Sequence, residues 1–483
     1  MFLGIDIGTS GVKAVVLDEH GALAAQGTAA LTVQRPQPLW SEQDPAAWWQ
    51  ATTAAVRAID PAVRRAVRGI GLAGQMHGAT LLGADDRVLR PAILWNDGRA
   101  HAECLELEAR VPTLRVVTGN IAMPGFTAPK LLWVAEREPE TFAAVRSVLL
   151  PKDYVRLLMT GEKASDMSDS AGTLWLDTGA RDWSDDMLAA TGLSRAAMPR
   201  LVEGSEQAGT LRADVADLWG MDRVPVAGGG GDNAAGAIGI GVVDEGDALL
   251  SLGTSGVIFV ATRDFRPNPA GAVHAFCHAL PGLWHQMSVH LSAASCIDWV
   301  AKLTGASGAA ELFALAESTG PASGPEVFLP YLSGERTPHN DPQVRGAFLS
   351  LDNDTSPARL AQAVLEGVAF ALADGLRVLR AAGTQVTRLS VIGGGARSRY
   401  WGATIAAALD VELAYLGGGE VGPALGAARL ARLAVDAAPL SEICAPPQIA
   451  HLIQPDPDLR DRLAPKAEAF RAAYPRISQR TPA

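Results

Sequence analysis

One pentapeptide occurs twice in the chain, and its residue types are those that hold phosphate. Residues 8–12 and 253–257 both read Gly-Thr-Ser-Gly-Val, about half of the 483-residue chain apart. Each copy lies between two apolar runs, the pattern of a turn between paired strands. Glycines flanking two hydroxyls offer backbone N–H groups and hydroxyl donors to an anion. Ordinary tight turns also favour these residues, but two copies in matching contexts predict a duplicated fold that holds a nucleotide phosphate between its halves.

Only the first copy has a carboxylate nearby. Asp6 precedes Gly8 by two positions, whereas Ser251 occupies the corresponding position before Gly253. A carboxylate beside a phosphate-binding turn suits Mg²⁺, either directly or through the water shell of the ion. We therefore expect Asp6 to serve a metal ion at the reacting phosphate.

A second acid follows a run of four glycines. Residues 228–231 end the predicted strand 224–227 and deliver Asp232 and Asn233 to the start of an apolar helix. Asp is a favoured helix N-cap, so one interpretation is purely structural. Four glycines give more clearance than a cap requires. The other interpretation therefore makes Asp232 the base for an alcohol that attacks a γ-phosphate, with Asn233 on a neighbouring hydroxyl.

Two polar segments have the composition of a sugar pocket. Met76 and His77 follow the predicted strand 68–73, and imidazole can both donate to and accept from a polyol. Trp95 and Asp97 combine an aromatic face with an acid. Both segments also fit ordinary turns, so neither decides the function alone. The neutral or weakly basic character of Met76 and His77 argues against an acidic sugar such as gluconate.

A third glycine-rich turn, residues 393–395, follows the predicted strand 389–392. Such a strand-to-helix turn can receive a phosphate or an adenine edge at a helix N-terminus. The chain contains neither a Walker A sequence nor the His-Arg-Asp and Asp-Phe-Gly motifs of protein kinases. Phosphoryl transfer by this chain would therefore use a different architecture.

The elements that must position these residues form a repeated α/β pattern. A hairpin meander followed by helices occurs once in each half, so we expect two similar domains, 1–243 and 244–483, with the ligands in a cleft between them. The predicted strands are 2–7, 12–17, 22–31, 68–73, 79–82, 224–227, 248–252, 257–261, 389–392 and 412–415; the predicted helices are 46–59 (N-cap Asp44), 292–303, 357–382 and 423–435, with a helical region at 99–160.

Composition and charge exclude several classes of protein. The net charge is −11, so the surface as a whole repels nucleic acid and anionic membranes. No apolar run approaches the roughly 20 residues of a membrane-spanning helix. The N-terminus lacks the pattern of a signal peptide, and the four cysteines show no CxxC spacing. We expect a cytoplasmic protein with reduced thiols that binds neither nucleic acid nor membrane.

Three segments resemble signatures of the FGGY carbohydrate kinases. Residues 2–13 resemble the opening of that family, residues 125–134 its first signature, and residues 346–367 its second, although Ser350 stands where glycine is usual. The resemblance covers the chain to about residue 435. It implies two ribonuclease-H-like domains of the actin/hexokinase type, with the sugar on the N-terminal domain and the nucleotide on the C-terminal one.

Within that family, residues 75–78, 95–99, 230–233 and 329–338 resemble the members that phosphorylate D-xylulose. The resemblance implies transfer of the ATP γ-phosphate to the 5-hydroxyl of this ketopentose, which feeds xylose catabolism into the pentose phosphate pathway. Asp232 would be the base and Asp6 would serve Mg²⁺. The other implied residues are Met76, His77, Trp95, Asp97 and Asn233 for the sugar, and Thr9, Ser10, Lys13, Gly253, Thr254, Ser255, Gly393, Gly394 and Arg397 for the nucleotide.

Two other functions stay open from the sequence. Other members of the family phosphorylate L-ribulose, L-rhamnulose, gluconate or glycerol. An actin- or chaperone-like switch would share the phosphate turns but would leave Asp232 and the residues around His77 unexplained. Sugar-dependent consumption of ATP separates a kinase from a switch. The sequence leaves the oligomeric state open, with a homodimer as one candidate.

Overall fold

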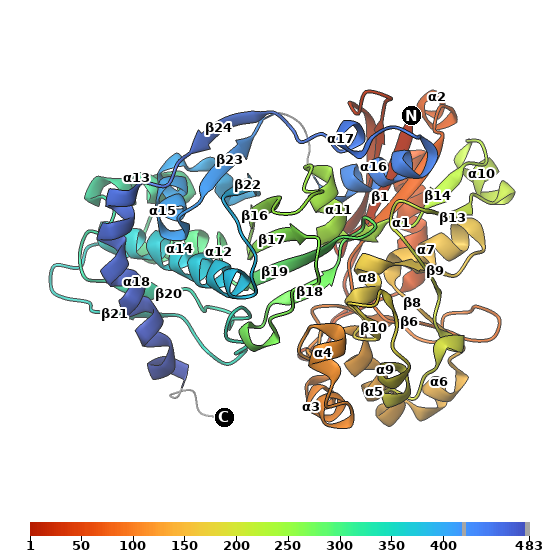
Figure 1. Ribbon diagram of the computed structural model, residues 1–483, viewed down its shortest axis with the longest axis horizontal. Coiled ribbons are helices and arrows are strands. Elements are labelled where there is room, and N and C mark those ends of the chain that lie inside the picture. The colour runs from red at the N-terminus through yellow and green to blue at the C-terminus, as the bar shows by residue number, and fades with distance from the viewer. Residues whose placement is uncertain (418–421, 479–483) are drawn as a thin grey trace.

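Each half of the chain builds one mixed sheet covered by helices (Figure 1). The computed structural model describes residues 1–417 and 422–478, without the side chains of residues 396 and 397. Within that part, the first sheet has the order β13-β14-β5-β1-β2-β3 with β15 beside β5, and the second has the order β18-β19-β17-β16-β22-β23-β24. The strands of the first are β1 (Phe2–Ile7), β2 (Gly11–Leu17), β3 (Leu23–Ala30), β5 (Gly69–Gly74), β13 (Gln207–Thr210), β14 (Pro225–Ala227) and β15 (Gly230–Gly231); those of the second are β16 (Ala248–Leu252), β17 (Gly256–Thr262), β18 (His274–Cys277), β19 (Trp284–His290), β22 (Arg388–Ile392), β23 (Glu412–Leu416) and β24 (Ile449–Ile453).

The two sheets repeat one pattern of strand directions. β1 is antiparallel to β2 and parallel to β5, and β5 is parallel to β14, whose other neighbour β13 is antiparallel. β16 is likewise antiparallel to β17 and parallel to β22, and β22 is parallel to β23, whose other neighbour β24 is antiparallel. This repetition confirms the predicted duplication and the α/β fold class.

The first helix forms where its capping residues predict it. α1 (Pro45–Arg57) has Asp44 as its N-cap, and the Asp44 carboxylate accepts a hydrogen bond from the Ala46 N–H at 2.9 Å. Proline at the first helical position has a fixed φ that suits helix entry. The helix buries Trp48 and Val56 in the core of the first domain, so local capping and burial agree.

The predicted helical region is a series of short helices rather than one element. Prolines at the starts of α6 and α7, and left-handed glycines that end α4 and α7, divide it. A short strand also interrupts the series. These elements are α3 (His101–Arg110), α4 (Leu114–Thr118), α5 (Thr127–Arg137), α6 (Pro139–Ala144), β8 (Ser147–Leu149) and α7 (Pro151–Thr160).

A helix from late in the chain returns to the first sheet. α16 (Pro423–Val435) lies beside α11 (Asp232–Gly239) and contacts β1 and β5, as the blue helix near the red strands in Figure 1 shows. A Cβ atom at Gly4 or Gly71 would lie 1.9 Å from a carbonyl oxygen of α16. Glycine is therefore required there for this close approach. The split at residue 243 thus leaves one helix of the second half on the first sheet.

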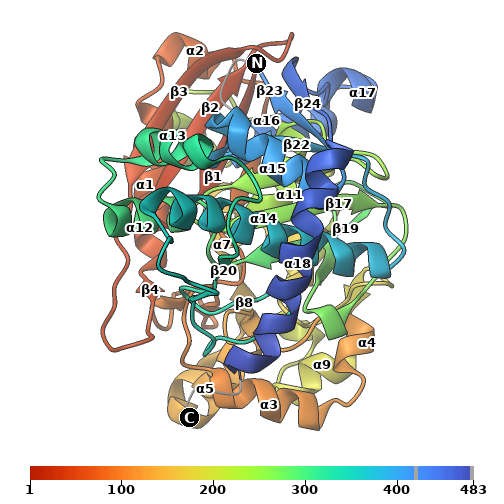
Figure 2. The same cartoon turned by 90° about the vertical axis from the view of Figure 1, so that its left-hand side faces the viewer.

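The segment after Ala437, which the sequence leaves undecided, completes the second domain. Its strand β24 extends the second sheet, and its helix α18 (Pro457–Ser478) lies across α14 (Pro357–Ala381) and α15 (Arg399–Leu409) in Figure 2. The remaining elements are β4 (Glu42–Gln43), α2 (Pro61–Arg65), β6 (Thr80–Leu82), β7 (Ala92–Ile93), β9 (Ala164–Asp166), α8 (Met167–Ala171), β10 (Leu176–Asp177), β11 (Asp182–Trp183), α9 (Asp185–Ala190), β12 (Arg200–Val202), α10 (Ala213–Trp219), α12 (Ser295–Thr304), α13 (Ala309–Thr319), β20 (Val327–Leu329), β21 (Ala347–Leu349) and α17 (Leu440–Ile443). No helix among the described residues is both long and apolar enough to cross a membrane.

Candidate active site

Three parallel strands of the first sheet end side by side, and each leads to predicted site residues. Ile7 of β1 and Gly231 of β15 both pair with Gly74 of β5. Asp6 is the last residue but one of β1, His77 follows β5, and Asp232 follows β15. Because the carboxyl ends of parallel neighbours meet at one edge, the fold gathers these residues from distant parts of the chain.

The two carboxylates at this edge both have raised pKa values. Burial raises the pKa of Asp6 to about 7, with a further increase from the charge of Asp232, and Lys13 opposes both effects. Lys13 is the cross-strand partner of Asp6 on β2. Burial also raises the pKa of Asp232 to about 6. The charge of Asp232 therefore acts on Asp6, and shifted pKa values of this kind are common at functional sites.

Asp232 is the first residue of α11, and Gly231 is the N-cap. The prediction that Asp232 itself caps the helix is therefore wrong. Its Oδ1 accepts hydrogen bonds from the N–H and the side-chain amide of Asn233, at 2.8 and 2.9 Å. These bonds favour the charged form and work against the rise in pKa. Asn233 thus orients the carboxylate directly.

His77 is held rigidly as a neutral imidazole. Its φ of 69° is left-handed, and its carbonyl oxygen accepts from the Lys130 ammonium at 3.0 Å and from the Thr127 hydroxyl at 3.2 Å. Its Nδ1 lies 2.7 Å from the Gly172 carbonyl oxygen, which requires a proton on Nδ1 and leaves Nε2 as an acceptor. Burial, and then the charge of Lys130, lower the pKa of His77 to about 3. A sugar hydroxyl can donate to this Nε2.

Both halves of the chain contribute aromatic rings around His77. Its ring lies 4.8 Å from that of Phe126 and 6.4 Å from that of Phe276 on β18. Met76, buried beside it, lies 3.0 Å from the position of a Cβ atom at Gly231. A larger residue at position 231 would therefore displace Met76. The sequence did not reveal Lys130, Gly172 or the Phe276 contact, because none of them lies near His77 in the chain.

Trp95 is joined to the site by a hydrogen bond to Thr9. The indole N–H of Trp95 donates to the Thr9 hydroxyl at 3.0 Å, and that hydroxyl donates to the Gln75 side-chain carbonyl at 3.0 Å. Gln75 in turn donates to Gln43 at 2.8 Å. Trp95 is 48% exposed, so its face is available to a ligand. Thr9, predicted for the phosphates, is thus held on the side of the site where we expect the sugar.

Asp97 has a different environment from the one the sequence suggests. It is only 3% exposed, and its carboxylate accepts from the Ser41 N–H at 2.6 Å and from the Arg99 guanidinium at 2.7 Å. The guanidinium lies 3.6 Å from the centre of the Trp40 ring. We therefore assign Asp97 a structural role and leave it out of the proposed sugar contacts.

The second sheet presents the predicted nucleotide residues at its own strand ends. Ser251 of β16 pairs with Ile392 of β22, so Gly253 and Gly393 follow parallel neighbours. Gly393 has a left-handed φ of 96°, and a Cβ there would lie 2.7 Å from the Leu252 carbonyl oxygen. A Cβ at Gly394 would meet no atom within 4 Å. The side chain of Arg397, also predicted here, lies outside the described residues.

The two identical pentapeptides adopt turns that differ by one residue. In the first, Ile7 pairs with Val12, and the Gly8 N–H donates to the Gly11 carbonyl at 3.0 Å. In the second, Leu252 pairs with Gly256, so Gly253, Thr254 and Ser255 form the loop. The side chains of Ser10, Thr254 and Ser255 are all exposed. They are available to phosphates, whereas the Thr9 hydroxyl is already engaged.

The chain is similar to known proteins along nearly its whole length. Residues 1–239 match the N-terminal domain, and residues 248–435 the C-terminal domain, of the FGGY family of carbohydrate kinases. A curated Escherichia coli (strain K12) relative named xylulose kinase is 57% identical, over 99% of both chains. A crystal structure described as a xyloylose kinase from Brucella ovis is 54% identical, with a TM-score of 0.95 over 99% of both chains. A xylulose kinase structure from Rhodospirillum rubrum is 29% identical, with a TM-score of 0.92 over 99% of this chain and 98% of that one.

Proposed function

Because the chain belongs to the FGGY family of carbohydrate kinases, we propose that it transfers the γ-phosphate of ATP to the 5-hydroxyl of D-xylulose. The products are ADP and D-xylulose 5-phosphate, an entry from xylose into the pentose phosphate pathway. The observation that carries the proposal is that Asp232 and a neutral His77 follow the ends of two paired strands, in a chain 57% identical to a xylulose kinase.

Asp232 is the base in this proposal. With a pKa of about 6, its carboxylate is mostly ionised at neutral pH and can accept the proton of the attacking hydroxyl. In a loose phosphoryl-transfer transition state that proton leaves late, so the carboxylate mainly orients the hydroxyl before collecting the proton. Asn233 supports this role because its two hydrogen bonds hold the carboxylate in the charged form.

The sugar lies against His77 and Trp95. A hydroxyl of the ketopentose donates to Nε2 of His77, and the exposed face of Trp95 packs against the C–H groups of the sugar. Met76 limits the depth of the pocket. A neutral imidazole offers no charge to a carboxylate, which favours an uncharged ketose over gluconate.

The nucleotide contacts the second sheet, and Asp6 serves the metal. Oδ1 of Asp6 is buried without a hydrogen-bond partner, and a nearby cation would stabilise this oxygen in its charged form. Mg²⁺, when bound, neutralises charge on the ATP phosphates. The described residues contain no group of three metal-ligating side chains, so the phosphates and water must complete the coordination. Thr254, Ser255 and the backbone at Gly393 and Gly394 face the phosphates in this proposal, with Ser10 and Lys13 from the first turn.

Both substrates are small metabolites of the cell interior, so we place the enzyme in the cytoplasm. Closure of the two domains over the ligands excludes water, and ATP hydrolysis without sugar is expected to be slow. A homodimer is compatible with this function, since every proposed contact comes from one chain.

The test is ADP release by the purified protein with Mg-ATP, alone and with each of several acceptors. We expect D-xylulose to give a rate well above those of L-ribulose, L-rhamnulose, gluconate and glycerol. 5-Deoxy-D-xylulose, which lacks the acceptor hydroxyl, should give no rate above background. Preference for another acceptor would overturn the assigned substrate, and a rate indifferent to every sugar would overturn the assignment as a kinase.

A further inference from the structure

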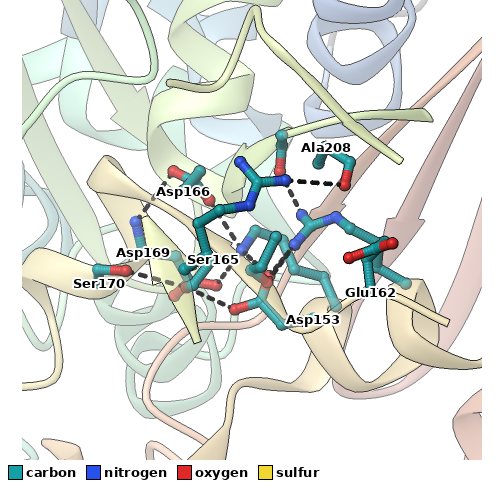
Figure 3. A network of polar contacts seen from close by, with 12 residues as sticks. Asp153, Glu162, Ser165, Asp166, Asp169, Ser170 and Ala208 are labelled. Atoms are coloured by element: carbon teal, nitrogen blue, oxygen red, sulfur yellow. Dashed lines mark hydrogen bonds and ion pairs between the residues drawn. The ribbon is translucent and has the colours of Figure 1, made fainter. Parts of the chain in front are cut away.

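Five charged side chains lie completely buried in the first domain, next to the loop that carries Asp232 (Figure 3). The ammonium of Lys152 lies 2.8 Å from Asp153, 2.8 Å from Asp166 and 2.9 Å from Asp169. Arg156, one turn along α7, lies 2.8 Å from Asp153. Figure 3 shows Asp153, Asp166 and Asp169 converging on one point.

This cluster is not explained by stability alone. Three carboxylates face two cations, and removing charges from water costs free energy that a buried pair often fails to recover. Burial lowers the pKa of Lys152, but the three carboxylates outweigh that effect and hold it above its usual value. Burial also raises the pKa of Asp169 well above its usual range. An apolar core would be less costly, so the segments to which the cluster is bonded indicate its role.

The cluster is bonded to the glycine loop at both of its ends. The Arg156 guanidinium donates to the Gly228 carbonyl oxygen, at the start of the loop. The Ser168 hydroxyl donates to Asp166 at 2.5 Å and accepts from the Gly231 N–H at 3.1 Å. Gly231 immediately precedes Asp232, so the Gly230–Gly231 peptide, one residue before the base, is held by a side chain that is itself bonded to the cluster.

The same cluster reaches His77 through the short helix α8. Asp166 caps that helix by accepting from the N–H groups of Ser168 and Asp169, at 2.8 and 3.2 Å. The other end of α8 is Gly172, whose carbonyl oxygen accepts from His77. The short helix α8 therefore contacts the glycine loop near its start, through Ser168, and His77 at its end, through Gly172.

We propose that Ser168 is a positioning residue for the base, acting from a frame that Lys152 holds together. Its hydroxyl joins the Asp166 carboxylate to the Gly231 N–H through two hydrogen bonds, and these bonds fix the position of the adjacent Asp232 carboxylate. Ser168 touches neither substrate, and its effect on the reaction is exerted through Asp232. The inference rests on the proposed function, because it assigns Asp232 the role of base.

Ser170 provides a matched control on the same helix. It is also completely buried, and its hydroxyl donates to Ser165 at 2.9 Å without contacting the glycine loop. Ser168→Ala removes the acceptor for Gly231, and Ser168→Cys replaces it with a weak acceptor of similar shape. Ser170→Ala removes a buried hydroxyl whose loss leaves the base loop untouched.

The experiment measures kcat, both KM values and the thermal midpoint of each variant. We expect kcat to fall about tenfold in Ser168→Ala and Ser168→Cys, the effect of losing one buried hydrogen bond that orients a reacting group. Both KM values should stay within about twofold, because α8 and His77 keep their other contacts. In Ser170→Ala, kcat should stay within about twofold, although its thermal midpoint falls as far as that of Ser168→Ala.

Amide hydrogen exchange provides a readout that does not depend on catalysis. In the ligand-free protein, a peptide covering residues 228–233 should exchange faster in Ser168→Ala than in wild type or Ser170→Ala. Unchanged exchange, or a kcat in both Ser168 variants equal to that of Ser170→Ala, would overturn the proposal. If wild type released no ADP with D-xylulose, the proposed function would fail, while the exchange result would still decide whether Ser168 holds the loop.

Discussion

The two copies of Gly-Thr-Ser-Gly-Val have one sequence and two environments. In the first, the Thr9 hydroxyl is bonded to both Gln75 and Trp95, and the acid Asp6 precedes the turn. In the second, Thr254 and Ser255 are exposed, and Ser251 replaces the acid. The first edge has carboxylates that can accept a proton or bind a metal ion, whereas the second edge offers exposed hydroxyls to phosphates. Identical local sequences therefore have different contacts, because the neighbouring strands and side chains differ.

The largest expected effect comes from the edge with carboxylates. Asp232→Asn keeps the shape of the side chain but removes the proton acceptor, so kcat should fall about a thousandfold. Binding of Mg-ATP, measured by calorimetry, should stay unchanged because Asp232 makes none of the proposed contacts to the nucleotide or to the metal ion. Ser251→Ala is the matched control, with kcat expected within about threefold of wild type. Comparable losses in the two variants would remove the distinction between the edges.

Making the two edges alike should weaken nucleotide binding. Ser251→Asp places a carboxylate where the second copy has none, and like-charge repulsion should raise the KM for ATP about tenfold. Ser251→Asn has nearly the same shape without the charge and should change this KM less than twofold. Steady-state kinetics at saturating D-xylulose measure both values. An equal rise in the two variants would show that shape, rather than charge, distinguishes the turns.

The two threonines should affect different substrates. Thr9→Val loses its bonds to Gln75 and Trp95 and should raise the KM for D-xylulose about three- to fivefold. Thr254→Val loses an exposed hydroxyl and should raise the KM for ATP by a similar factor. Each substitution should leave the other KM within about twofold. If Thr9→Val raised only the KM for ATP, Thr9 would belong with Ser10 and Lys13 among the phosphate contacts and not on the sugar side.

The smallest effect is a shift in pH dependence. Asp232 must be ionised to accept a proton, so kcat/KM for D-xylulose should fall as the pH drops below about 6. The side-chain amide of Asn233 donates to the Asp232 carboxylate and favours its charged form. Asn233→Ala removes this bond but keeps the bond from the backbone N–H, so the pKa of Asp232 should rise. The acidic limb should therefore move to higher pH. A limb that stays in place, or moves lower, would contradict the role assigned to Asn233.

Much of the site was predictable because its signals are local. Asp6 stands near the end of a strand that the spacing of apolar residues reveals, and Asp232 follows a run of four glycines after another such strand. The cap of α1 was equally visible, because a capping acid bonds within three residues of itself. The parallel pairing of β15 with β5, by contrast, involves a strand of two glycines and could not be found from the spacing of apolar residues.

Residues whose role depends on distant partners could not be assigned in this way. Asp97 lies in a segment with the composition of a sugar pocket, yet its carboxylate accepts hydrogen bonds from the buried Arg99 guanidinium and from the Ser41 N–H. The bond between Ser168 and Gly231 joins positions 63 residues apart. Neither relation leaves a periodic or compositional trace in the chain.

The sequence by itself determined the duplicated turns, the glycine loop with its acid and the absence of a Walker motif, because these depend on residue type and spacing over a few positions. Only the tertiary structure decided that Thr9 is held by Trp95, that α16 returns to the first sheet and that a buried ionic cluster is bonded to the glycine loop before Asp232. Those outcomes depend on contacts between segments far apart in the chain, and burial and charge pairing there outweigh local preference.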